Sequence, residues 1–433
     1  MTAINLDSVA IPDPAAMNSR GVPYKNRPRG FLIFLGFGVA AVNGALLATA
    51  ILTLPLAAGR LDANSATAIL SITLAIGGLV GLVAYPAIGR LSDRTTLRMG
   101  RRRPYLYLGA ALIAVGALLT IVATSTALLT VGYVVTTLGG VAALVAASAL
   151  VPDQIAPAQR GTPSAMIGLG TPIGAVLGIF LAQLVQPNLT AMIALPAAVA
   201  VIATIALALF ITEDQLPASA RAPFAIREFL GTFWVNPVTH SSFGWAWWSR
   251  LMIFIGVSAV NAYQAFYLII VLHQDPATVG TSILIATVIL TGISVIFAPI
   301  VGKISDKVGR RKPFVIVAAL VFGIGLALVA SASTYPAFLI AIAVMGLGQG
   351  VYFAVDFALV TQVLPDPDNP AKDLGIMNLA NQLPSTALPA VAPLILAIGA
   401  SAANPQNFTA LFVAGAIAAF LGALFILPIR SVK

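Results

Sequence analysis

One acidic side chain interrupts an apolar run in the second half of the sequence. Asp356 is the only one of the 14 acidic residues that falls inside such a run, and Gln349 and Tyr352 share its helical face at i, i+3 and i+7 spacing. An ionised carboxylate in hydrocarbon costs about 2.5–3.5 kcal/mol on insertion scales, so such a residue is a candidate functional group. Asp356 is therefore the predicted proton-coupling residue. The alternatives are a neutral, hydrogen-bonded packing residue and a substrate contact without coupling.

Amides and tyrosines are the other polar side chains placed where they could form a binding site. Each amide offers a donor and an acceptor, and an aromatic face packs on the C–H surface of a sugar ring, so together they suit a neutral polyhydroxylated ligand. The alternative role is hydrogen bonding between helices. The predicted substrate-binding residues are Asn43, Gln183, Asn261, Gln264, Tyr267, Gln349, Tyr352, Asn378, Asn381 and Gln382, with Tyr133 as a weaker candidate.

The elements that carry these residues are long apolar segments. The chain has 433 residues, of which 59% are hydrophobic and 9% charged, whereas soluble domains carry about 25% charged residues. A membrane-spanning helix needs about 20 apolar residues. The sequence predicts an all-α membrane protein with twelve transmembrane helices near 30–57, 66–90, 105–124, 127–151, 164–186, 190–212, 248–272, 278–302, 314–332, 336–363, 374–400 and 407–429.

The twelve segments divide into two similar sets of six. Gly89-Arg-Leu-Ser-Asp93 recurs as Gly302-Lys-Ile-Ser-Asp306, and each copy leads into a basic cluster and a proline. Two halves related by duplication are the economical interpretation. The predicted organisation is a cytoplasmic N-terminal tail, a six-helix bundle, a cytoplasmic linker, a second bundle and a cytoplasmic C-terminus, at 1–29, 30–212, 213–247, 248–429 and 430–433.

Positive charge is distributed unevenly between the two sides that alternating spans create. All of the 23 Lys and Arg residues except Arg60 fall on one side, so the positive-inside rule predicts a multi-pass protein of the plasma (inner) membrane with both termini in the cytoplasm. The net charge of +9 is then expected to face membrane lipids and requires no nucleic acid.

The segment from Gly89 to Pro104 resembles the signature loop between helices 2 and 3 of the major facilitator superfamily. Gly89-x-Leu-x-Asp93-Arg94 followed by Gly100-Arg-Arg carries the likeness, which extends to the copy between helices 8 and 9. The resemblance implies two six-helix bundles with pseudo-two-fold symmetry. It also implies a cytoplasmic latch in which Asp93 faces the start of helix 11 across the interface. The predicted gating residues are Gly89, Asp93, Arg94, Gly100, Arg101, Arg102, Arg103, Asp306 and Arg310, with Asp153 and Arg160 as a further ion pair. The alternatives are positive-inside anchors with an acid for local balance and, for Asp153 and Arg160, a solvated loop.

Within that superfamily, Ser92-Asp93-Arg94 and Gly100-Arg-Arg-Arg-Pro104 are similar to sucrose/proton symporters and, more loosely, to glycoside-pentoside-hexuronide cation symporters. The sequence departs from the sucrose-type carriers in helix 1, where Asn43 stands in place of an acid, and in helix 4, which carries no charge. The resemblance favours a monomeric secondary transporter that moves a neutral sugar or glycoside with protons by alternating access.

Other functions remain as alternatives. They are a proton-driven exporter of drugs or lipophilic compounds, an uncoupled facilitator and, less favoured, a non-transporting sensor. With no Cys, two His and no phosphate-binding glycine loop, no cofactor, no metal and no enzymatic activity are expected.

Overall fold

The computed structural model describes residues 30–156, 159–213, 215, 239–365, 370–400 and 405–429. The predicted tails 1–29 and 430–433 and most of the predicted linker 213–247 lie outside these residues. Twelve helices of the described part are long and apolar enough to cross a membrane, which confirms the predicted all-α class.

The N-terminal half is built from six spans. Its first span continues from α1 through a π-helical turn, Thr49–Thr53, into α2. The elements are α1 (Phe31–Ala48), α2 (Leu54–Leu61), α3 (Ala66–Asp93), α4 (Arg103–Ile121), α5 (Thr126–Gln154), α6 (Gly161–Leu184) and α7 (Leu189–Phe210).

The C-terminal half repeats this plan. Its first span, α9, also ends in a π-helical turn, Tyr267–Val271, and α9 begins at Ser241, inside the stretch predicted to be linker. The elements are α9 (Ser241–Phe266), α10 (Val279–Val308), α11 (Lys312–Ser331), α12 (Tyr335–Gln362), α13 (Pro370–Leu396) and α14 (Phe408–Ile426).

Local sequence signals begin equivalent helices in both halves in the same way. The side chains of Ser125 and Thr334 accept a hydrogen bond from the first turn of α5 and of α12, and Asn188 and Asn407 do so for α7 and α14. Such caps satisfy backbone N–H groups that a helix leaves without partners. The repeated caps support the duplication inferred from the sequence.

Close packing against α1 explains three glycines of α6, Gly170, Gly174 and Gly178. A methyl group on Gly178 would overlap the carbonyl group of Gly44 on α1, so the two backbones touch at a point where neither residue tolerates a side chain. Small residues allow this approach in membrane helices, where packing rather than the hydrophobic effect holds helices together. Large apolar side chains such as Ile33 and Leu394 are exposed on the outside of the bundle, as contact with lipid requires.

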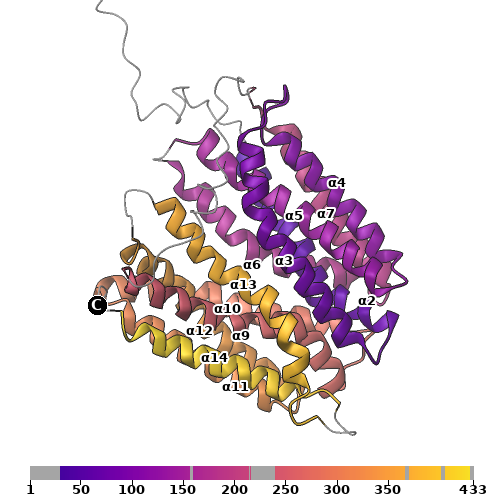
Figure 1. Ribbon diagram of the computed structural model, residues 1–433, viewed down its shortest axis with the longest axis vertical. Helices are drawn as coiled ribbons and strands as arrows, with labels where there is room; N and C mark the ends of the chain where they lie inside the picture. The colour runs from indigo at the N-terminus through magenta and orange to yellow at the C-terminus, as the bar shows by residue number, and fades with distance from the viewer. Residues whose placement is uncertain are drawn as a thin grey trace, which may run out of the picture.

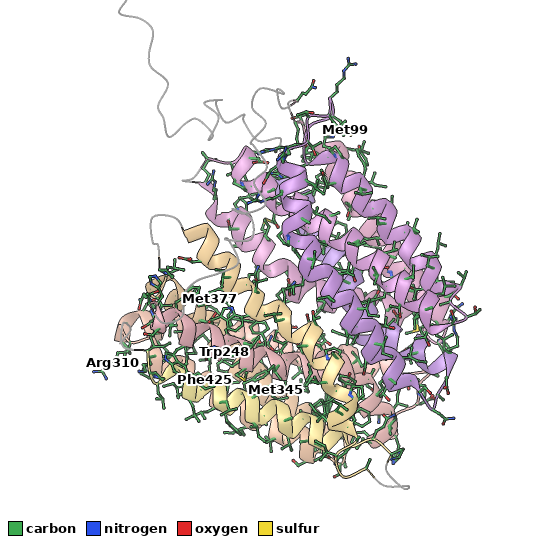
Figure 2. All side chains as sticks on the ribbon, in the orientation of Figure 1. Met99, Trp248, Arg310, Met345, Met377 and Phe425 are labelled. Atoms are coloured by element: carbon green, nitrogen blue, oxygen red, sulfur yellow. The ribbon has the colours of Figure 1, made fainter. Side chains whose placement is uncertain are left out.

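The two bundles lie at an angle to each other (Figure 1). The bundles meet where α3 packs on α13 and α6 packs on α10. They separate toward the upper left of Figure 1. The loops after α3 and after α10 carry the clusters Arg101–Arg103 and Arg310–Lys312, and we call the end of the molecule that holds them the basic end. The opposite end, with the loops after α2 and after Val271, is the far end. Met99 and Arg310, which mark the basic end of each half, lie at separate corners of Figure 2.

Candidate functional site

A cavity with a volume of about 1560 Å³ lies between the two halves. Helices from both bundles line it: α1, α3, α5 and α6 on one side, and α9, α10, α12 and α13 on the other. Small-molecule sites are commonly 300–1,000 Å³ in volume, so this space exceeds a single sugar and includes its access route.

The cavity opens toward the basic end. On α3 its lining runs from Leu74 to Asp93, the last residue of that helix, so the wall continues to the mouth. The mouth also carries Arg90 and Gly89.

Hydrogen bonds between the two halves close the far end. The hydroxyl groups of Ser71 on α3 and Tyr263 on α9 are 2.6 Å apart, and Gln406 donates to Thr67 at 2.5 Å. The Thr281 hydroxyl on α10 accepts from Gln183 at 3.2 Å and from Gln186 at 2.8 Å. We call these side chains the far-end clasp: Thr67, Ser71, Gln183, Gln186, Tyr263, Thr281 and Gln406.

Most of the predicted substrate-binding amides line this cavity, on helices from both halves. Asn43 and Asn261 occupy matching positions on α1 and α9, each ahead of the π-helical turn of its span. The predicted residues on the lining are Asn43, Asn261, Gln264, Gln349, Asn378, Asn381 and Gln382, and Tyr133 lines it as well.

The other three predicted substrate-binding residues are not on the lining. Gln183 belongs to the far-end clasp. Tyr352 is 2% exposed and packs edge to face against Phe254, with ring centroids 6.5 Å apart. Both side chains therefore support the cavity wall in this conformation.

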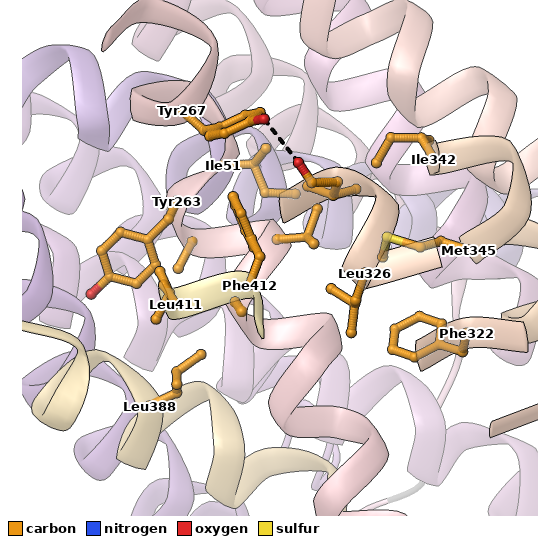
Figure 3. Close-up of a cluster of buried hydrophobic side chains, with 14 of the residues drawn as sticks. Ile51, Tyr263, Tyr267, Phe322, Leu326, Ile342, Met345, Leu388, Leu411 and Phe412 are labelled. Carbon is orange, nitrogen blue, oxygen red and sulfur yellow. Dashed lines mark hydrogen bonds between the residues drawn. The ribbon is translucent and has the colours of Figure 1, made fainter. Parts of the chain in front are cut away.

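Tyr267 lies in the packed interior of the C-terminal half. Its hydroxyl donates to the carbonyl oxygens of Val329 at 2.8 Å and Ala332 at 2.5 Å, and its ring packs on Phe412 (Figure 3). The sequence argument placed Tyr267 on the face of Asn261 and Gln264. Each three-residue step falls about 60° short of a full turn, so two steps carry the side chain about 120° round the helix and away from the cavity.

Asp356 is buried directly behind the lining and pairs with a residue that the sequence analysis missed. Its Oδ2 lies 3.3 Å from Arg250 Nη1, and the two side chains are 7% and 14% exposed. Arg250 itself lines the cavity. The predicted span began at 248 and treated Arg250 as a flanking cation, but α9 begins at Ser241 and places it inside the bundle. The indole side chains at Trp245, Trp247 and Trp248, which are typical of a membrane interface, were the signal that the helix starts earlier.

Arg250 also binds an amide on the cavity wall. Its Nε donates to Asn381 Oδ1 at 2.7 Å, and Asn381 Nδ2 donates to Asn378 Oδ1 at 3.2 Å. A continuous chain of polar contacts therefore joins the buried carboxyl group on α12 to two amides of α13.

The predicted gating residues of the N-terminal half form an ion-pair network at the basic end. Arg102 contacts Asp93 at 2.6 Å and Asp153 at 2.8 Å, and Arg101 also pairs with Asp153. The predicted partner of Asp153 was Arg160, but the Arg160 guanidinium donates to the carbonyl oxygens of Ile155 and Pro152. Gly100 adopts a left-handed backbone conformation, with φ 96°. The basic cluster that follows Gly100 contacts Asp153, which the sequence spacing of Asp153 and Arg160 did not indicate.

Glu213 is a second residue that sequence analysis did not select. Its Oε2 accepts hydrogen bonds from the backbone N–H groups of Arg102 and Arg103, both at 2.8 Å, where α4 begins. A helix N-terminus favours an anion. Burial raises the pKa of this carboxyl group above its ordinary value, and the two N–H donors act in the opposite direction.

The C-terminal half repeats the network with a different arginine from the one predicted. Asp306 pairs with Arg311 at 2.5 Å, whereas the carbonyl oxygen of Arg310 accepts from Ser305. In the N-terminal half, Asp93 likewise pairs with Arg102 while Ser92 donates to the Arg101 carbonyl. The motif copies therefore align Arg102 with Arg311.

The latch across the interface stays a prediction for another conformation. The described partners of Asp93 are Arg101 and Arg102 of its own half, and its side chain is 57% exposed at the cavity mouth.

Comparison with known proteins gives the family. A sequence model described as Major Facilitator Superfamily matches residues 31–294 and 271–433. The chain belongs to the Major Facilitator Superfamily. It is a membrane transporter and not an enzyme.

Curated relatives in this superfamily match only short stretches. An uncharacterised MFS-type transporter of Bacillus subtilis, YfiU, is 36% identical over 110 residues, or 25% of this chain and 21% of that protein. The sucrose transport protein SUT5 of Oryza sativa subsp. indica is 39% identical over 49 residues, or 11% of this chain and 9% of that protein. The matches thus span about a fifth and a tenth of these relatives.

Solved structures of the superfamily share the fold over nearly the whole chain. The nucleoside transporter NupG aligns with a TM-score of 0.72 at 12% identity and covers 92% of this chain and 100% of its own. A D-xylose–proton symporter aligns with a TM-score of 0.67 at 16% identity and covers 93% and 97%. The peptide transporter POT aligns at 0.68 and 18%, covering 95% and 98%. At such identities, the likeness establishes the fold alone.

Proposed function

We propose that this protein is a secondary transporter that couples the movement of a neutral sugar or glycoside to protons by alternating access. The observation that carries the proposal is the buried contact between Asp356 and Arg250 beside the cavity, 3.3 Å between Oδ2 and Nη1. Protonating Asp356 removes the charge that balances Arg250, so one proton changes the electrostatics of the cavity wall and of the contact between α9 and α12.

The lining supports a polar, uncharged solute. Amides from both halves face the cavity, each with a donor and an acceptor for hydroxyl groups. The charged residues among the described lining are Arg250 in the interior and Arg90 and Asp93 at the mouth. The short match to a sucrose transport protein and the shared fold of a D-xylose–proton symporter agree with a sugar as solute.

Energetics permit useful accumulation with one coupling ion. One proton moving down 100 mV releases about 2.3 kcal/mol. At about 1.4 kcal/mol per tenfold change, this supports roughly forty-fold accumulation of a neutral solute.

We also propose the plasma membrane as location, a cytoplasmic basic end, cytoplasmic termini and a monomer. The supporting observation is that the basic loops of both halves lie at one end, where anionic headgroups of the inner leaflet stabilise Lys and Arg by about 1 kcal/mol each. The structure then corresponds to an inward-open carrier.

A two-step experiment tests the function. A panel of mono- and disaccharides is first screened for thermal stabilisation of the purified carrier, with lipophilic cations as the comparison set. Proteoliposome uptake of the sugars that stabilise it is then measured with and without an imposed pH gradient, for the wild type and Asp356→Asn. Asp62→Asn, at an exposed position in the loop after α2, is the matched control.

The proposal expects gradient-driven accumulation by the wild type and by Asp62→Asn. Asp356→Asn should lose accumulation but keep counterflow, because exchange needs no net proton movement. Stabilisation by lipophilic cations and by no sugar would favour an exporter, and unchanged accumulation by Asp356→Asn would remove that residue from the coupling step.

A further inference from the structure

Arg250 determines which way the amide of Asn381 points. A guanidinium group carries only donors, so the atom of Asn381 that lies 2.7 Å from Arg250 Nε must be the carbonyl oxygen. A flipped amide would place its NH₂ group against the guanidinium, with two donors facing each other and no proton acceptor between them. The orientation of Asn381 is therefore fixed by the chemistry of its neighbour.

The same constraint passes to Asn378. With its oxygen committed to Arg250, Asn381 turns its NH₂ group toward Asn378, whose oxygen accepts at 3.2 Å. Asn378 is exposed on the cavity wall one turn before Asn381 on α13. Its own NH₂ group has no protein acceptor among the described residues, so it is left for a molecule in the cavity.

Burial of the ion pair keeps Arg250 in place to impose this orientation. Asp356 on α12 pairs with Arg250 Nη1 while Arg250 Nε donates to Asn381 on α13, and both charged side chains are largely shielded from water. Tyr352 lies one turn before Asp356 on α12, and Asp373 is buried about two turns before Asn381 on α13. Among the described lining residues, α10 contributes neutral groups to this part of the wall, such as Thr291 and Ser294.

On the opposite wall of the cavity, the amide of Asn43 is fixed with its NH₂ group turned to the backbone of α1 and its oxygen left as the exposed acceptor. Asn43 Nδ2 donates to the Val39 carbonyl one turn earlier on α1, at 2.9 Å, and Asn43 Oδ1 is turned toward Thr171, which donates to it at 3.4 Å. Asn43 and Thr171 both line the cavity. The α1 wall thus presents an amide oxygen where the α13 wall presents amide N–H groups.

We propose that the Asp356–Arg250 pair fixes the hydrogen-bond polarity of α13, so that Asn378 presents N–H donors and selects an acceptor oxygen of the solute. Asn381 is the positioning residue that transmits the constraint, and Asn378 is the specificity-determining residue. The solute class, a sugar, rests on the proposed function, whereas the fixed polarity of the amides does not.

A test without solute compares acceptor and apolar replacements of Asn381. Asn381→Asp keeps an oxygen toward Arg250, and Asn381→Leu keeps the approximate volume with no polar group. Thermal unfolding of the purified carrier at neutral pH should place Asn381→Asp well above Asn381→Leu. In the background Arg250→Leu/Asp356→Leu, where the cation is gone, the order should reverse because the new carboxylate is then unpaired. Gln382→Glu, the same amide-to-acid change on the neighbouring lining residue, controls for added negative charge.

The effect of Asn381→Asp in the two backgrounds tests the inference even if Asn381→Leu fails to fold. The inference is overturned if Asn381→Asp changes the melting temperature by the same amount in the wild-type background and in the background without Arg250. The guanidinium would then not set the amide orientation.

A second arm concerns the solute and uses sucrose, D-xylose and the other sugars of the stabilisation panel as probes. Asn378→Asp keeps the oxygen that accepts from Asn381, loses the N–H donors and adds a negative charge, for which Gln382→Glu is the control. Sugar binding should weaken about tenfold, and more than in Gln382→Glu. Asn378→Ser, which retains one donor, should restore part of the affinity. Undiminished binding by Asn378→Asp overturns the assignment of Asn378. A wild type that binds no sugar would refute the proposed function instead and leave the stability comparison to decide the amide polarity.

Discussion

Arg250 on α9 lies 3.3 Å from Asp356 on α12, so a cation on the cavity wall is balanced by an anion that does not reach the wall. This division places charge compensation behind the surface that a solute would touch. The state of the carboxyl group can therefore change the charge of the wall without a change in the side chains that line it.

Removing Arg250 alone should destabilise the protein. Arg250→Leu leaves Asp356 buried without its cation, and breaking a buried pair in this way typically costs about 3–5 kcal/mol. Replacing both residues by Leu should recover most of this loss. Denaturant unfolding in micelles measures both effects, and Arg311→Leu, which removes the partner of the exposed Asp306, should change stability by about 1 kcal/mol or less. Equal losses at the two sites would contradict a buried role for the pair.

Acidification should make the cavity attract anions. Because the chain has no native Cys, Ser385→Cys on the cavity wall can be labelled without background. The rate ratio of an anionic to a cationic thiosulfonate reagent, each corrected for its pH-dependent reaction with a free thiol, should rise several-fold as Asp356 binds a proton. In the background Asp356→Asn the ratio should be high throughout. A ratio that follows pH equally in both proteins would show that another group is responsible.

Weakening the far-end clasp should open that end. Tyr263→Phe removes the hydrogen bond to Ser71 between the halves, so the open-far-end state should gain population. Labelling of Ser258→Cys in the cavity by an impermeant reagent applied from the far side measures this change. Tyr335→Phe is the control, since its hydroxyl bonds Ser282 within one half. Equal labelling in the two variants would argue against the clasp.

Glu213 should make stability depend on pH. Its pKa is raised above the ordinary value of 4.5 by burial, so the folded protein binds this proton more tightly than the unfolded chain. Its contribution to stability is fully present below pH 4.5 and is lost as the pH rises through the folded-state pKa. Melting temperatures of wild type and Glu213→Gln across this range should diverge, with the wild type losing stability relative to the variant. Parallel curves would assign the pH dependence to other groups.

Hydropathy and charge were sufficient to predict the twelve spans, because insertion into lipid requires every spanning segment to be apolar and helical. The repeat could be recognised in the sequence because the two motif copies, with Asp93 and Asp306, fall near the ends of equivalent helices. Asp356 was found because a carboxyl group is rare in such a segment.

Contacts between helices were harder to predict. Arg250 lay at the edge of the predicted span 248–272 and was not selected as a site residue, whereas α9 begins at Ser241 and places it well inside the helix. Tyr267 was assigned to the cavity because periodicity along one helix does not show which neighbour each face meets. The choice between Arg310 and Arg311 as the partner of Asp306 depends on the turn at Gly309, with φ 67°, which spacing alone does not specify.

The far-end clasp consists of uncharged groups, whereas the rim at the basic end is built from ions. Dissolved electrolyte weakens attraction between exposed charges over about 10 Å at 0.1 M and has little effect on neutral hydrogen bonds. Ionic strength should therefore act on one end of the molecule and not on the other. With the predicted latch at the basic end, the balance between the two accessible states should shift with the surrounding salt, before any solute or gradient is applied.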